Sequence, residues 1–247
     1  MTSWMSPTSS SEATNLLLHR GHVSGEVRVE VAFTGNGIDL AERSDDSRAT
    51  EAAVTRLSDI LGVPVVRMRQ VHGVQVHHVV RGSDGSFGPV PEADALVTTE
   101  PGVALLARSA DCVPVLLADT SVGVVGAVHA GRVGFDRGVV GRCVEHMREL
   151  GAVDLQAWVG PAACGSCYEV PAEMRDDVAS RHPVASSTTS WGTPALDVPA
   201  GVAAELRALG VQVDELGPCT IEDARTFSHR REQGRAGRSG ALVWVAA

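Results

Sequence analysis

Apolar and polar residues alternate with a period of two in several short stretches of the chain, which is the pattern of β-strands. The first such stretch covers residues 26–33, and residues 65–80 show the same alternation with a break at Gly73. Nearly continuous apolar runs separated by turn residues predict four buried strands, at 95–100, 102–111, 113–119 and 122–131. Three further strands are predicted at 155–160, 211–216 and 241–245.

Apolar residues at helical spacing mark the other regular elements. They predict helices over residues 47–62, 134–151, 171–181 and 199–210. Strands cluster in the middle of the chain and helices fall around them without strict alternation, which favours an α+β fold over a doubly wound sheet. We therefore predict one domain over residues 15–247, built of mixed, largely antiparallel sheets flanked by helices. Residues 1–14 are rich in Ser and Thr and predict a disordered tail.

Composition and charge restrict the class of protein. Hydrophobic residues make up 44% of the chain and the net charge is −9, so neither nucleic acid nor an anionic membrane is an expected partner. The first residues have no basic start or apolar run of the signal-peptide type, and the five cysteines fit a reduced compartment, so we expect a cytoplasmic protein. All 21 basic residues are arginine, which excludes lysine Schiff-base chemistry and the phosphate-binding lysine of a P-loop.

The runs 113–119 and 122–131 predict a hairpin that brings a cysteine to a histidine. With the turn at Thr120 and Ser121, Asp119 faces Val122, and in the same register Cys112 faces His129. Opposite Cβ atoms lie about 4.5–5.5 Å apart, close enough to share a metal ion or a proton. A thiolate and an imidazole are ligands of zinc type, and catalytic zinc takes three protein ligands.

The third candidate ligand is His72, which stands beside a glycine in the sequence QVHGV. A buried structural thiol is the competing interpretation of Cys112, because free cysteines are often core residues. His77, His78 and His146 are expected to be surface, cross-strand or structural residues.

Two other motifs carry weaker signals. The CGSC sequence at 164–167 lacks a second cysteine pair at zinc-knuckle spacing and does not follow a thioredoxin-like unit, so we expect a structural or incidental use. The sequence RTFSHRREQGRAGR at 225–238 holds five arginines, which can bind a phosphate or carboxylate, or can pair with acids of the protein itself.

Several of these stretches together resemble one protein family. The sequences RQVHGVQV, ADALVTTEPGVAL, ADCVPVLLAD, VGAVHAGRVG, WVGPAACGSCYEV and FSHRREQGRAGRSGALVW resemble, in order and spacing, the YfiH-like or laccase-domain family. Its members are called polyphenol oxidase, purine nucleoside phosphorylase or peptidoglycan editing factor. The resemblance runs from about Arg69 to the C-terminus, and it implies that His72, Cys112 and His129 bind a metal, zinc or, in the laccase reports, copper.

The resemblance also implies an activity. It implies phosphorolysis of adenosine, inosine and methylthioadenosine and deamination of adenosine, with a nucleoside and phosphate as partners of a monomer or homodimer. Cys112 then acts as a catalytic metal ligand, and Asp111 is the candidate for proton transfer. Arg230 and Arg231 stand where the family has SYRR, and Arg132 stands where it has the tryptophan of HAGW; we take all three as candidates for binding substrate or phosphate.

The loop over residues 34–46 departs from the family pattern, since it is shorter and lacks an expected arginine, which Arg43 or Arg132 would have to replace. Three alternatives remain open on the sequence. One is a copper-dependent phenol oxidase, and a second is a hydrolase with Cys112 as nucleophile and His129 as base, acting on peptidoglycan precursors. The third is a metal-binding protein that has lost turnover.

Overall fold

Two six-stranded sheets pack face to face and form the centre of the protein in the computed structural model, which describes residues 3–4, 16–42 and 47–247. The first sheet has the order β1 (Ser3–Trp4), β2 (Leu17–Ser24), β3 (Arg28–Thr34), β14 (Ser239–Val245), β7 (Ala104–Ser109) and β4 (Val65–Arg67). The second has the order β13 (Gln212–Glu215), β10 (Gln156–Val159), β8 (Val113–Asp119), β9 (Val124–Ala130), β6 (Ala95–Thr98) and β5 (Val76–His78).

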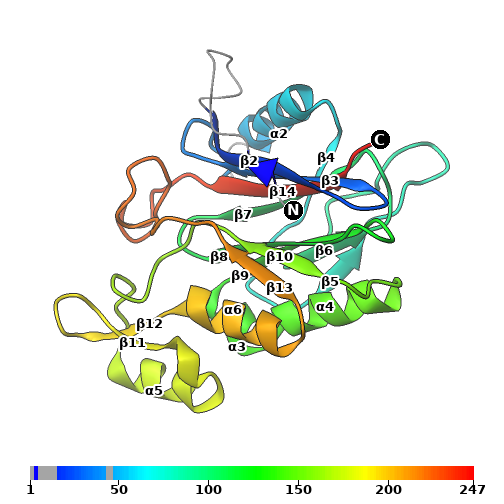
Figure 1. Cartoon of the computed structure of the whole chain (residues 1–247). Coiled ribbons are helices and arrows are strands. Elements are labelled where there is room, and N and C mark those ends of the chain that lie inside the picture. The colour runs from blue at the N-terminus through cyan, green and yellow to red at the C-terminus, as the bar shows by residue number, and fades with distance from the viewer. Residues whose placement is uncertain (1–2, 5–15, 43–46) are drawn as a thin grey trace.

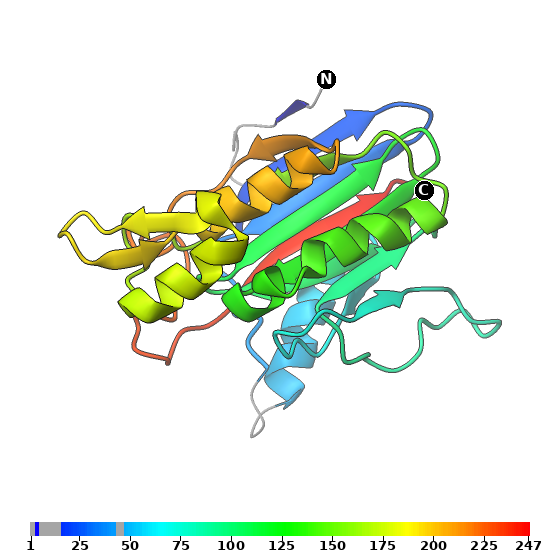
Figure 2. The same cartoon turned by 90° about the horizontal axis from the view of Figure 1, so that it is seen from below.

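Helices cover the outer faces of both sheets (Figure 1). Helix α2 (Ser47–Leu61) packs on the first sheet, and α3 (Arg132–Asp136), α4 (Val139–Glu149) and α6 (Val198–Ala208) lie on the second. Figure 2 shows α4 and α6 side by side across that sheet. Helix α5 (Ala172–Arg181), a short 3₁₀ turn at Pro183–Ala185 and the pair β11 (Ser186–Thr188) and β12 (Pro194–Leu196) lie to one side.

The predicted fold class is confirmed: the chain forms one α+β domain whose sheets are mixed and largely antiparallel. In each sheet the parallel pairs are terminal ones, β4 with β7 in the first, and β10 with β13 and β5 with β6 in the second. The central strands read as continuous apolar runs because both of their faces are buried. In β8, for example, Val115 and Leu117 face the helices while Leu116 and Ala118 face the first sheet.

The predicted hairpin register is wrong by two residues. In the structure Asp119 pairs with Val124, and Pro114 instead of Cys112 pairs with His129. The turn is longer than expected because the Asp119 carboxylate accepts hydrogen bonds from the N–H and hydroxyl of Ser121 inside it. A shift of two residues leaves every side chain on its predicted face, so Cys112 and His129 remain on the same side of the sheet.

Other differences concern the helices and the N-terminal region. The helix predicted over 134–151 is two helices, α3 and α4, because Gly138 between them has a φ of 84°. Strand β2 was not predicted. Ser3 and Trp4, within the predicted tail, pair with β2, and the rest of residues 1–14 lies outside the described residues, as does Arg43. No helix in the described ranges is long and apolar enough to cross a membrane.

Candidate metal centre and active site

The structure brings the three predicted metal ligands together at one end of the second sheet. Cys112 lies immediately before β8, His129 lies in β9, and His72 lies in the loop between β4 and β5. The Cys112 Sγ is 3.7 Å from His72 Nε2, the two imidazole centroids are 4.8 Å apart, and one donor atom from each of the three residues lies within 4.8 Å of the others. His129 is buried, Cys112 is half-buried and His72 is exposed, so the cluster runs from the protein interior to its surface.

Asp94 orients both histidines, and the sequence analysis did not identify it. This fully buried carboxylate accepts backbone hydrogen bonds from Val71 (3.2 Å), His72 (3.0 Å) and Gly73 (2.6 Å), and its Oδ1 lies 2.8 Å from Nδ1 of His129. It therefore holds the loop in which His72 adopts a left-handed φ of 58°. Since Nδ1 of His129 donates to Asp94, Nε2 of that ring is left free for a metal, which is the usual arrangement at a carboxylate–histidine–metal site.

Gly131, the glycine of the HAG sequence, lies against two of the candidate ligands. A Cβ at this position would lie 2.5 Å from Cδ2 of His72 and 3.2 Å from Sγ of Cys112. Both contacts are shorter than normal for a Cβ, so any side chain at position 131 would displace the ligands. The glycine keeps the space between the ligands open.

The electrostatics of the site favour the thiolate form of Cys112. Burial alone would raise the pKa of the Cys112 thiol, but the neighbouring His129 and His72 lower it to about 6. Burial alone would lower the pKa of His129, but Cys112 and Asp94 raise it to about 9. For Asp94, the hydrogen bonds from His129, Gly73 and Val71 outweigh the effect of burial and lower its pKa. Cys112 is therefore a thiolate at neutral pH, and a thiolate is the form of cysteine that binds metals.

The donor set fits a catalytic metal ion of the zinc class. It offers one sulfur and two imidazole nitrogens, and such a set leaves one of four tetrahedral positions open. The same ligands also suit copper, so the donor set alone does not choose between the two metals.

A cavity of about 710 Å³ opens beside these ligands. This volume is in the range of sites for small molecules and cofactors. Among the described residues that line it, five are arginines and two are carboxylates, so the pocket is locally basic in a chain of net charge −9. The charged lining residues are Arg69, Arg108, Arg132, Arg230, Arg238, Glu42 and Asp111.

Asp111, the residue assigned to proton transfer, lines the pocket and joins two of its walls. Its Oδ1 accepts a hydrogen bond from the Thr220 hydroxyl at 2.6 Å, and its Oδ2 accepts one from the Arg230 N–H at 2.7 Å. The residue has a left-handed φ of 82°. Its carboxylate is therefore held in one orientation beside Cys112.

The three predicted anion-binding arginines occupy different places. Arg132, at the start of α3, and Arg230 line the pocket, and the Arg230 guanidinium carbon lies 5.1 Å from the centroid of the Tyr168 ring. The Arg231 guanidinium donates instead to backbone carbonyls of the same loop, including those of Thr220 (2.6 Å) and Asp223 (3.1 Å). Arg231 is not among the described residues that line the pocket.

Sequence reasoning also missed Arg108, which is 5% exposed and lines the pocket. It donates hydrogen bonds to Glu42 at 2.9 Å and to the carbonyls of Leu40 (3.2 Å) and Met68 (2.9 Å). The sequence offered one signal for Arg108, its position near the end of a predicted strand and shortly before Cys112. Its partner Glu42 comes from a distant loop, and no local sequence pattern connects Glu42 with Arg108.

The CGSC motif and the histidines His77, His78 and His146 are not among the described residues that line this pocket, whereas His229 is. Burial is the main cause that raises the pKa of Cys164 and Cys167, whereas an attacking redox thiol needs a lowered pKa. His77 and His78 lie in β5, and His78 packs edge-on against His146 of α4, with ring centroids 6.1 Å apart.

The fold and the site define a two-sheet α+β protein with a candidate Cys/His metal centre in a basic pocket. Known proteins are similar to this chain in sequence and in fold. A family model described as multi-copper polyphenol oxidoreductase laccase matches residues 30–246. Purine nucleoside phosphorylase ORF3 of Streptomyces griseus is 49% identical over 207 residues, which cover 81% of this chain and 83% of that protein. A purine nucleoside phosphorylase of Mycobacterium bovis is 45% identical over 207 residues, with 81% of each chain covered.

Solved structures agree with the sequence comparisons. YlmD from Geobacillus stearothermophilus has a TM-score of 0.74 and 30% identity, covering 89% of this chain and 92% of that one. A Bacillus licheniformis protein, YfiH, has a TM-score of 0.74 and 26% identity, covering 87% and 92%. The chain belongs to the laccase-domain, or YfiH-like, family, as the sequence motifs had indicated.

Proposed function

We propose that the protein is a zinc-dependent purine nucleoside phosphorylase that uses phosphate to cleave adenosine, inosine and methylthioadenosine and that also deaminates adenosine. The observation that carries the proposal is the clustering of His72, Cys112 and His129 in the lining of a basic pocket. The names of the relatives support the reaction, since they are purine nucleoside phosphorylases at 45–49% identity.

Charge and size of the pocket support a nucleoside and a phosphate as substrates. The arginine side chains offer bidentate hydrogen bonds to phosphate oxygens, which lysine could not replace with the same geometry. We assign phosphate binding to Arg132 and Arg230, the two predicted arginines that line the pocket. The Tyr168 ring beside Arg230 supplies a flat surface on which a purine can stack.

The chain's own residues would divide the work as follows. His72, Cys112 and His129 would hold the zinc ion. Once bound, the ion would act as a Lewis acid with one coordination position open. Asp94 keeps the His129 proton on Nδ1. Asp111 is our candidate for moving a proton at the purine ring, and its hydrogen bonds to Thr220 and Arg230 fix its orientation. We further propose that the protein is cytoplasmic, because a reducing compartment would keep the Cys112 thiolate available. We propose a monomer or homodimer as its oligomeric state.

The test combines product analysis with metal content. The untagged protein is incubated with adenosine, with and without phosphate, and the products are separated by chromatography. We expect adenine and ribose 1-phosphate only when phosphate is present and inosine in either case. Cys112→Ser should lose both activities and the zinc of this site, whereas the control His146→Gln, on α4 outside the pocket, should keep them. Wild-type protein that binds zinc but forms none of these products would contradict the proposal.

A second candidate function has one observation in its favour. Cys112, His129 and Asp94 stand in the order nucleophile, base and orienting carboxylate, and the shifted pKa values of Cys112 and His129 describe a thiolate–imidazolium pair. A hydrolase of this kind would keep its activity after zinc is removed by a chelator. A zinc-dependent phosphorylase would lose activity under the same treatment, so chelation separates the two functions.

A further inference from the structure

Three cysteines from two loops that are far apart in the sequence meet outside the pocket. Cys164 and Cys167 lie in the loop after β10, and Cys219 lies in the loop after β13. The parallel pairing of β10 with β13 continues past the strand ends as a bridge between Ala162 and Cys219, which draws the two loops together. One donor atom from each of the three cysteines and from Glu222 lies within 4.8 Å of the others.

The backbone of both loops is folded so that these donors converge. The loop with the first two cysteines forms a tight turn, in which the N–H groups of Cys167 (3.0 Å) and Tyr168 (2.9 Å) both donate to the Cys164 carbonyl. Cys219 begins a similar turn, because the Glu222 N–H donates to its carbonyl at 3.2 Å, and this turn brings the carboxylate back over the cysteine. The turns place a CxxC pair on one loop and a Cys-x-x-Glu pair on the other.

One backbone donor points at a sulfur of this group. The Cys164 N–H lies 3.4 Å from Sγ of Cys219. A hydrogen bond from a backbone N–H stabilises a sulfur that carries negative charge. The Cys219 sulfur is therefore placed to carry negative charge, and three thiolates at this spacing need a cation between them.

We propose that Cys164, Cys167, Cys219 and Glu222 form a second metal site, which binds a zinc-class divalent ion through three thiolates and one carboxylate. Three sulfur ligands select a zinc-class ion over magnesium or calcium. With Zn–S bonds of about 2.3 Å, tetrahedral ligands stand about 3.8 Å apart, within the separations seen here. Four protein ligands leave no open position, so this ion is structural and takes no part in substrate chemistry.

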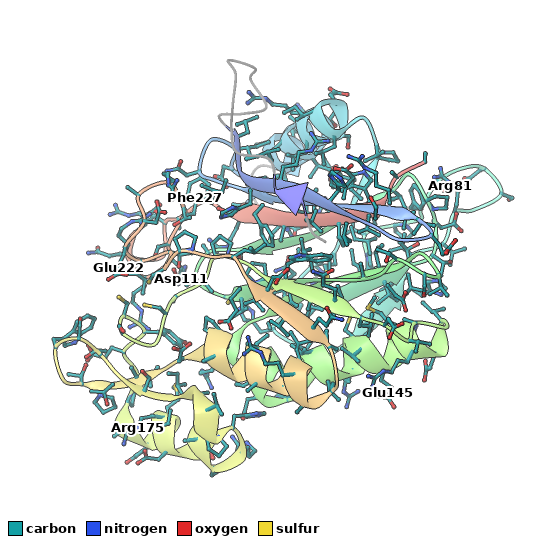
Figure 3. All side chains as sticks on the ribbon, in the orientation of Figure 1. Arg81, Asp111, Glu145, Arg175, Glu222 and Phe227 are labelled. Atoms are coloured by element: carbon teal, nitrogen blue, oxygen red, sulfur yellow. The ribbon has the colours of Figure 1, made fainter. Side chains whose placement is uncertain are left out.

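The ion would hold together two walls of the active-site pocket. Tyr168, which follows Cys167, lines the pocket, and Thr220, which follows Cys219, donates its hydroxyl to Asp111. Figure 3 shows Glu222 and Asp111 at the same end of the molecule, opposite to Arg81. Ligands of the second ion thus stand next in sequence to residues that shape the pocket, although the ion is not part of it.

The experiment uses cobalt(II) as a probe in the full-length chain. In Cys112→Ser the first site has no sulfur, so a thiolate-to-cobalt charge-transfer band can come only from the second cluster. We expect this variant to show the band, a further Cys219→Ser change to abolish it, and a further Cys143→Ala change to retain it. Cys143 is the matched control because it is a buried thiol of α4 outside both clusters.

Zinc content provides an independent readout that does not depend on activity. Wild-type protein should contain two zinc ions per chain, and Cys112→Ser and Cys219→Ser should contain one each. Glu222→Ala changes an exposed side chain and should fold normally, yet weaken the second site by about tenfold or more. No charge-transfer band in Cys112→Ser, a zinc content that Cys219→Ser does not lower, or a disulfide between these cysteines in anaerobically purified protein would overturn the proposal.

Discussion

Replacing Asp94 by asparagine should uncouple both histidines from the metal centre. The carboxylate receives only donors: Oδ1 accepts from the N–H of His72 and from His129 Nδ1, and Oδ2 accepts from the N–H groups of Val71 and Gly73. An amide has one oxygen and one NH₂ group. Whichever way the asparagine amide is oriented, its NH₂ group must therefore face two donors.

The two orientations differ in cost. With NH₂ at the Oδ2 position, the part-buried backbone N–H groups of Val71 and Gly73 lose their acceptor, at no more than about 2–6 kcal/mol in total. With NH₂ at the Oδ1 position, only the His72 N–H is left unpaired, at about 1–3 kcal/mol, provided that His129 accepts at Nδ1. The second orientation costs less, but it moves the His129 proton to Nε2, the atom needed for the metal. We therefore expect a stability loss of about 1–3 kcal/mol and a 10- to 100-fold loss of zinc affinity.

Urea unfolding of the metal-free variant and zinc competition with a chelator measure the two effects. The control is Asp59→Asn, which changes an exposed carboxylate on α2. Because the pKa of Asp94 is lowered in the folded protein, its contribution to stability is present above about pH 4 and is lost as the pH falls further, so the two proteins should converge in acid. An Asp94→Asn protein with wild-type zinc affinity and an unchanged urea midpoint would refute this reasoning.

Four further predictions concern the ligands and the arginines. With a thiol pKa of about 6, Cys112 of the metal-free protein should react with iodoacetamide as a thiolate at pH 7. The alkylation rate should fall tenfold for each pH unit below 6, and bound zinc should protect the thiol. An alkylation rate that rises only above pH 8 would contradict this. Gly131→Ala places a Cβ 2.5 Å from the His72 ring and should lower zinc affinity in a chelator titration, with unchanged affinity as the contrary result. Arg230→Ala should raise the phosphate KM about 10-fold or more while the melting temperature stays near wild type, and an unchanged KM would remove it from phosphate binding. Arg231→Ala should lower the free energy of unfolding by about 1–3 kcal/mol and leave the phosphate KM unchanged, because the Arg231 guanidinium donates to backbone carbonyls of its own loop. A raised KM in a stable variant would contradict this.

The sequence predicted the central strands well because their burial leaves a strong signal. Strands such as β8 and β9 are buried on both faces and appear as apolar runs bounded by turns. Strand β2 was missed because its sequence LLHRGHVS mixes polar and apolar residues and is only half-buried. The length of the β8–β9 turn depends on how the Asp119 side chain bonds within it, which alternation alone does not encode.

The sequence indicated the three candidate ligands, which the structure brings together, but it did not indicate the residues that support them. Cys112 and His129 could be paired from the hairpin because an error of two residues preserves the faces of both strands. Asp94 escaped notice because its partners come from a loop more than 20 residues earlier and from β9, and only the folded chain brings these together. For the same reason the sequence could not show that Arg230 lines the pocket while its neighbour Arg231 donates to backbone carbonyls of its own loop.

Phosphorolysis by this chain should require a metal ion held by His72, Cys112 and His129. The most direct measurement strips the protein of metal, adds zinc back stepwise, and follows adenine release from adenosine in the presence and absence of phosphate. We predict adenine only with phosphate, in proportion to the zinc bound at these three residues, and none from Cys112→Ser at any zinc concentration. Adenine release without any metal, or no adenine release from a fully zinc-loaded wild-type protein, would contradict this requirement.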